Sequence, residues 1–227
     1  MHPYDPIFSF NIGRLVIDIK PEAIIQLGII LLIGILAWFV TRNLKIKPEG
    51  KRQIVVEYIY NIVQSAVDAN MGEKYRDVIP FIGTLATFIL VMNLMGLTGL
   101  PVPTKNFSVT IALALIAFVF IQAYTIRKIG LKHYFIGYSK PMGMMLPINI
   151  LERIMLPVSL SLRLFGNILA ATFLVELVYE ALAGVSWFAQ IIIPVPLHAY
   201  FDIFDGGIQM VIFVMLTMIN LKITVEH

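Results

Sequence analysis

The chain has 227 residues, of which 59% are hydrophobic and only 14% charged. Soluble domains carry about 25% charged residues, so this composition, with a mean hydropathy of +0.85, excludes a soluble globular protein and predicts an integral membrane protein. The formal net charge of +3 comes from basic residues beside apolar runs, a distribution that is typical of membrane topology and argues against a nucleic-acid partner.

The first apolar run, residues 23–41, is long enough to span a bilayer, which takes about 20 residues. A basic cluster follows it, consisting of Arg42, Lys45, Lys47, Lys51 and Arg52. Because basic loops stay in the cytoplasm, the N-terminus is predicted to lie outside. Over residues 49–71, apolar residues recur at helical spacing with polar residues between them, which predicts an amphipathic helix at the membrane surface.

Four more apolar runs follow, at residues 78–100, 107–126, 148–182 and 197–223. With the first run they predict a single membrane domain of about five transmembrane helices, an all-α fold whose C-terminus lies in the cytoplasm. The run 148–182 is much longer than a perpendicular span requires. We therefore expect a long, tilted C-terminal helix hairpin, or a helix broken near Pro157.

Arg163 lies in the interior of the fourth run, with no acidic residue within two helical turns. Asn167 follows four residues later and shares its helical face. A guanidinium stays charged at any biological pH, and placing one at the bilayer centre costs roughly 2.5–3.5 kcal/mol on insertion scales. The protein must therefore use this charge or neutralise it from another segment.

A second set of polar residues falls on the last two runs. It comprises Thr172, Glu176 and Glu180 on the face opposite Arg163, then Asp202, Asp205 and Gln209 at spacing i, i+3, i+7, with Asn220 on nearly the same face. In an antiparallel pair the four carboxylates gather in the outer half of the membrane, and Gln209 reaches the depth of Arg163. Carboxylates persist in a membrane where water or cations reach them. The pattern therefore predicts a hydrated acidic vestibule that is open to the outside and ends near the arginine.

Simpler interpretations of these residues remain open. Arg163 is alternatively a structural residue paired with Asp202 or Asp205, Glu180 an interfacial residue, and His198 a solvated or capping histidine. The sequence contains no phosphate loop, HExxH or GxSxG motif. We therefore expect no cofactor, no metal site and no nucleotide site on this chain.

Residues 159–170 read SLSLRLFGNILA and closely resemble the signature of subunit a of the F-type ATP synthases, in which an arginine is followed by LFGN. Other segments are similar to the corresponding parts of bacterial a subunits: MNLMGL at 92–97, the loop around Pro103 and Thr104, PINILERI at 147–154 and IQMVIFVMLTMINL at 208–221. The resemblance covers most of residues 78–222.

This resemblance implies the stator half of a rotary ion motor in the bacterial plasma membrane. Such a chain lies against a ring of c subunits, provides two offset half-channels, and has the b subunits of the peripheral stalk, other synthase subunits and membrane lipid as further partners. Ions are expected to enter past Glu176, Asp202 and Asp205. Arg163 matches the family's arginine, and Gln209 matches the glutamine that faces it. The ion, H+ or Na+, stays open because its selective site is expected on the c subunit.

The sequence departs from the enterobacterial-type pattern at two positions. Thr172 stands where that pattern has a glutamate nine residues after the arginine, and Asp202 stands where it has a histidine seven residues before the glutamine. The acidic function is therefore expected at Glu176 and Asp202. Two rival classes remain: a stand-alone secondary cation transporter, which usually shows repeated halves, and a purely structural membrane anchor.

Overall fold

The computed structural model describes residues 8–12, 15–19, 21–42, 44, 50–98, 102–131, 134, 146–184 and 192–226. Its first element is a β-hairpin that the hydropathy pattern did not predict. Strand β1 (Phe8–Ile12) pairs antiparallel with β2 (Leu15–Ile19), with Phe8 opposite Ile19 and Ile12 opposite Leu15. Aromatic and β-branched residues in both segments favour extended backbone. The other elements of the described residues are helical.

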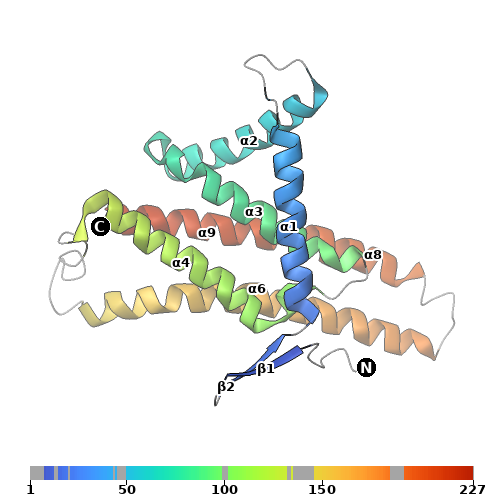
Figure 1. The fold of residues 1–227 in the computed structure, drawn as a ribbon. Helices are drawn as coiled ribbons and strands as arrows, with labels where there is room; N and C mark the ends of the chain where they lie inside the picture. Colours follow the sequence, from blue (N-terminus) through green and yellow to red (C-terminus); the bar gives the residue numbers. More distant parts are fainter. Residues whose placement is uncertain are drawn as a thin grey trace.

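Long helices joined by short helical turns form the rest of the described chain (Figure 1). In chain order they are α1 (Pro21–Thr41), α2 (Lys51–Asn70), the 3-10 turn η1 (Glu73–Val78), α3 (Ile79–Leu94), the 3-10 turns η2 (Met95–Thr98) and η3 (Pro103–Lys105), α4 (Phe107–Ile129), α6 (Leu146–Ala183), α8 (Pro194–His198), the π-helix η5 (Ala199–Asp205) and α9 (Gly206–Glu226).

Five helical stretches are long and apolar enough to cross a membrane. They are Ile24–Thr41, Glu73–Thr98, Phe107–Ile129, Pro147–Ala183 and Pro194–Glu226. This finding confirms the all-α membrane class predicted from composition. Backbone polar groups have no water partners in the hydrocarbon layer, and a helix satisfies them within one segment.

The fourth apolar run forms one continuous helix. α6 contains 38 residues and passes through Pro157 without ending there, so the unbroken alternative is the one that the structure adopts. α9 runs antiparallel beside α6, and α1 crosses both steeply in the view of Figure 1. The long C-terminal hairpin is therefore present, with α6 as its longer arm.

The last apolar run is not one uniform helix. A short α8 leads into the π-helix η5, and only from Gly206 does the regular α9 continue. A π-helix bonds residue i to i+5 and is wider than an α-helix, so the side chains after it point in directions that differ from those of a continuous α-helix. Such turns are frequent at functional sites. In this chain η5 carries both Asp202 and Asp205.

Two apolar clusters hold the helices together. The first joins α3, α4, α6 and α9 around Ile89, Ala117 and Leu164, and receives only Ile29 as a buried residue from α1. The second joins the end of α2 and η1 to α9, with Tyr75 and Met218 almost completely buried. Most large apolar residues of α1 stay exposed, as expected for a helix that faces lipid.

Helix α2 lies outside the set of candidate spans. Its C-terminal part packs into the second cluster through Val67. Apolar residues of its earlier turns, including Ile54, Tyr58 and Ile62, are exposed, so this helix offers an apolar surface to lipid or to a partner.

Candidate functional site

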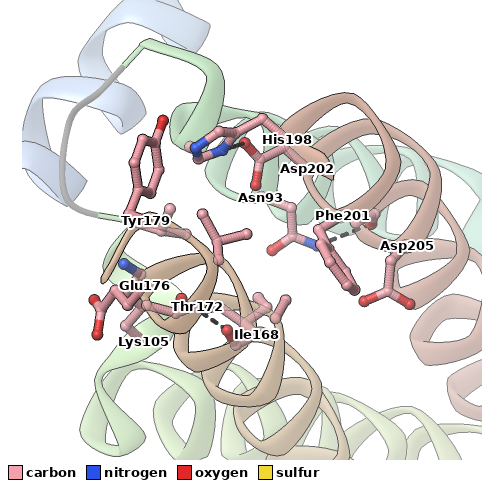
Figure 2. Close-up of a pocket in the computed structure, with 15 residues that line it drawn as sticks. Asn93, Lys105, Ile168, Thr172, Glu176, Tyr179, His198, Phe201, Asp202 and Asp205 are labelled. Atoms are coloured by element: carbon pink, nitrogen blue, oxygen red, sulfur yellow. Dashed lines mark hydrogen bonds and ion pairs between the residues drawn. The ribbon is translucent and has the colours of Figure 1, made fainter. Parts of the chain in front are cut away.

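A cavity of about 430 Å³ lies between α6, η5 and the turns that follow α3 (Figure 2). Four residues of the predicted vestibule line it: Thr172, Glu176, Asp202 and Asp205. The structure thus brings together side chains from two separate helices, α6 and η5. Glu180 is exposed one turn beyond Glu176 on α6 and is not among the residues that line this cavity.

Several lining residues were not assigned to the vestibule by sequence reasoning. They are Asn93, Lys105, Tyr179 and His198. Lys105 comes from η3 and brings a positive charge to the cavity wall. Tyr179 lies on α6 one turn after Val175, and its ring is 6.1 Å from the ring of His198. The cavity is therefore acidic on two sides but carries a cationic and an aromatic side chain as well.

Asp202 has the most closely defined surroundings of the carboxylates in the cavity. Its Oδ2 atom lies 3.0 Å from Nδ1 of His198. The two residues are four positions apart, so they meet on one side of the helix. His198 is thus a partner of Asp202 rather than a merely solvated or capping residue, and its i, i+4 spacing to Asp202 is the signal that could have shown this from sequence.

Asn93 fixes the start of α9 against the end of α3. Its Nδ2 atom donates to the Gly206 carbonyl at 2.9 Å, and its Oδ1 atom accepts from the Thr104 hydroxyl at 3.3 Å. Gly206 allows this contact because a Cβ there would lie 3.1 Å from the Cβ of Asn93. This glycine therefore serves close packing, whereas a Cβ at Gly207 would meet no heavy atom within 4 Å.

Gln209 occupies a different environment from the two aspartates before it. Regular α-helical spacing predicted a common face for Asp202, Asp205 and Gln209. In the structure the two aspartates lie on the π-helix and line the cavity, while Gln209 lies on α9, is 5% exposed and does not line it. The wider turn of η5 explains this separation, because it breaks the 3.6-residue period between the two segments.

Arg163 lies on the outer surface of the described molecule. Its side chain is exposed, and none of the ion pairs among the described residues includes it. A Cβ at Gly166 would meet no atom within 4 Å, and Ala170 is exposed one turn further on. The structural alternative, in which Asp202 or Asp205 neutralises Arg163, is therefore not what the structure shows.

The remaining predicted residues lie on the same two long helices. Asn167 is half-buried one turn after Arg163. Thr172 donates its hydroxyl hydrogen to the Ile168 carbonyl at 2.9 Å, and Asn220 donates from Nδ2 to the Leu216 carbonyl at 2.7 Å. The hydroxyl of Thr172 and the amide nitrogen of Asn220 are therefore each paired with a backbone carbonyl of their own helix.

Comparison with known proteins decides the family. The family model described as the ATP synthase A chain matches residues 23–222. The chain belongs to this family. Subunit a of ATP synthase from Staphylococcus saprophyticus is 33% identical over 100% of this chain and 99% of its own length. ATP synthase subunit a 2 from Bradyrhizobium sp. BTAi1 is 35% identical, over 94% and 92%.

A third relative is the sodium ion specific subunit a of Propionigenium modestum, which is 32% identical over 84% of this chain and 68% of its own length. Membership of the ATP synthase A chain family confirms the resemblance found around Arg163 and the predicted role as the ion-translocating stator subunit. The chain is a multi-pass bacterial membrane protein that functions within the ATP synthase complex.

Proposed function

We propose that this subunit passes ions between the cavity of Figure 2 and a ring of c subunits, and that Arg163 is the charge that unloads the ring. The observation that carries the proposal is the free guanidinium on an open face of α6, beside Gly166 and Ala170. Small residues let another helix approach closely, so a partner with its own carboxylate fits this face.

The proposed mechanism rests on the electrostatics of this face. A fixed guanidinium favours the charged form of a nearby carboxylate, so a ring carboxylate gives up its ion when it faces Arg163. The same charge repels cations that approach along α6. Both effects are strong because the dielectric around the site is low. Arg163 thus separates an ion-loading side of the ring from an ion-releasing side.

The cavity is proposed as the outer access path to the ring. Glu176, Asp202 and Asp205 attract cations into it, and water in a 430 Å³ space keeps these carboxylates solvated. We place Asn167 and Gln209 at the inner end of the path, near the arginine, with Thr172 along its wall. Glu180 and Asn220 are proposed as supporting polar residues at the margins.

We also propose the orientation and the further contacts of the subunit. The basic residues that follow 23–41 place that end in the cytoplasm, so the N-terminus lies outside and the C-terminus inside the plasma membrane. The exposed apolar residues of α2, such as Ile54 and Ile62, offer a contact for membrane lipid or for the b subunits of the peripheral stalk.

The test is ATP-driven acidification of inverted membrane vesicles from cells that carry Arg163→Ala, compared with wild type, in sodium-free buffer and with added sodium. We expect the wild type to pump and the variant to lose pumping while soluble ATPase activity survives. Arg127→Ala is the matched control, because Arg127 is an exposed arginine at the end of α4. Equal pumping by Arg163→Ala and wild type would refute the proposal.

The sodium arm of the experiment addresses the ion. A proton-driven ring acidifies the vesicles in sodium-free buffer. A sodium-driven ring pumps without acidification, so its pumping is measured as Na+ uptake into the vesicles, and its ATP hydrolysis is stimulated by added Na+. Co-purification of the chain with an oligomeric c ring separates this proposal from a stand-alone cation transporter, which transports without a partner.

A further inference from the structure

The carboxylate of Asp202, on η5, lies close to the backbone of Gly96, which belongs to the short turn η2. A Cβ built on Gly96 would stand 2.7 Å from Oδ1, 2.8 Å from Cγ and 2.9 Å from Oδ2 of Asp202. Non-bonded carbon atoms have their optimal separation near 3.5–4.0 Å, so even an alanine does not fit without displacing the acid. A side chain at position 96 would therefore move the Asp202 carboxyl group out of its present position.

The same carboxylate is held on its other side by His198, whose Nδ1 lies 3.0 Å from Oδ2. The Asp202 side chain is 18% exposed, and that exposed part belongs to the wall of the cavity in Figure 2. Gly96 also lines this cavity. The carboxylate thus occupies a defined seat between η2 and η5, with a histidine on one side and a glycine backbone on the other.

An aspartate at position 96 would project its side chain into this same seat. The Cβ atom of an aspartate at position 96 would lie beside the present Asp202 carboxyl group. The carboxyl group of that aspartate would reach the space between η2 and His198. Two acidic side chains cannot both occupy this position, because their atoms would overlap. One acid, supplied from either segment, fits it.

We propose that positions 96 and 202 form a single carboxylate seat on the ion path, in which Gly96 is a positioning residue and the acid can be supplied from η2 as well as from η5. This inference rests on the proposed function of the cavity. Ion transport is proposed to need a carboxylate at this position in space, whichever residue supplies it. Moving the acid from position 202 to position 96 should therefore preserve ion transport, whereas a variant that displaces or removes the carboxylate should lose it.

The functional test uses the intact ATP synthase in inverted vesicles and measures ATP-driven ion pumping. Gly96→Ala displaces the carboxyl group and Asp202→Ala removes it. Each is expected to lower the pumping rate roughly tenfold or more, by analogy with residues that orient metal ligands, whose loss costs roughly 10–100-fold. The combination Gly96→Asp with Asp202→Ala is expected to recover pumping to near the wild-type rate. Gly83→Ala is the control, since a Cβ there meets only Val63 methyl groups at 3.7 and 3.9 Å.

A second test probes the geometry without relying on transport. The chain contains no cysteine, so a disulfide in Gly96→Cys with Asp202→Cys is unambiguous. The Gly96 Cβ position lies 2.8 Å from the Asp202 Cγ atom, so the two Cβ atoms are at most about 4.3 Å apart after one further bond of about 1.5 Å, which is below the roughly 4.5 Å limit for a disulfide. Gly83→Cys with Asp202→Cys is the control, because position 83 lies about 20 Å back along α3 at 1.5 Å per residue.

The outcomes are distinct. Rapid oxidation of the 96/202 pair but not of the 83/202 pair, together with recovered pumping in the exchange variant, supports the shared seat. Failure of the 96/202 pair to form a disulfide overturns the geometry, whatever the chain transports. A disulfide without recovery in the exchange variant, or normal pumping by Gly96→Ala, overturns the interchangeability of the two positions. The proposed function itself is decided separately by Arg163→Ala.

Discussion

Replacing Asn93 by leucine tests how the start of α9 is held. Asn93 is 4% exposed, and Thr104, which donates to it, is completely buried. The substitution leaves the Thr104 hydroxyl without its acceptor. It also removes one of two donors from the Gly206 carbonyl, which keeps the backbone hydrogen bond of the first turn of α9. An orphaned buried polar group costs about 1–3 kcal/mol, so the free energy of unfolding should fall by about that amount.

A double-mutant cycle isolates the contact between Asn93 and Thr104. Thr104→Val alone leaves the Asn93 oxygen unpaired, while Asn93→Leu with Thr104→Val removes both partners of this hydrogen bond. The loss in the double variant should therefore be smaller than the sum of the single losses by about 1 kcal/mol, the net value of one hydrogen bond. Neighbouring residues in one network show such coupling.

The assay is thermal unfolding of the purified full-length subunit in mild detergent, followed by tryptophan fluorescence. For a chain of this size each kcal/mol shifts the midpoint by roughly 2–4 °C, so Asn93→Leu should lower it by about 2–12 °C. Strict additivity of the two single variants would show that the 3.3 Å contact contributes nothing. An unchanged midpoint in Asn93→Leu would refute the whole account of this network.

Three further predictions concern other contacts. The rings of Phe81 and Phe120 are stacked with centroids 3.6 Å apart, so Phe120→Leu should lower the free energy of unfolding by about 1 kcal/mol in the same thermal assay. Leu115→Ala, at an exposed position on α4, is the control. An equal loss in this control would show that the ring stacking contributes nothing of its own. The Lys74–Glu226 ion pair is exposed on both sides, so Glu226→Gln should leave the unfolding midpoint unchanged within error; a drop of several degrees would contradict this. The Arg76 guanidinium lowers the pKa of Asp68 below its ordinary value of 3.8. The pair therefore stabilises the folded state fully at any pH above the pKa that Asp68 has in the unfolded chain. This stabilisation is lost as the pH falls through the lower pKa that Asp68 has in the folded state. Hydrogen exchange of residues 73–78 should accordingly be slower in wild type than in Asp68→Asn at neutral pH and equal in both at strongly acidic pH, and a difference that grows with acidity would reverse the argument.

Hydropathy and charge were sufficient to predict the membrane class and the helices that cross it. These features depend on about 20 consecutive residues at a time, so single side chains do not change them. The paired strands at residues 8–12 and 15–19 were missed because two five-residue strands carry little periodicity, and their pairing depends on the partner strand.

The structure brings together some of the predicted site residues and separates others. Glu176, Asp202 and Asp205 line one cavity, as their spacing on two antiparallel helices indicated. The position of Gln209 could not be inferred, because nothing in the sequence indicates that residues 199–205 form a π-helix. The seat over Gly96 could not be predicted either, since it depends on a contact between segments more than 100 residues apart.

The length of α6 constrains the route that an ion can take. At 1.5 Å per residue, its 38 residues measure about 57 Å, nearly twice the hydrocarbon thickness of about 30 Å. A straight rod of this length that fits within the layer leans so far that its two ends are displaced sideways by roughly 50 Å. Arg163 stands near the middle of the rod, 17 residues after Leu146 and 20 before Ala183. Openings at the two ends of α6 therefore cannot lie above one another, and an ion that enters at one must be carried sideways in the plane of the membrane before it leaves at the other.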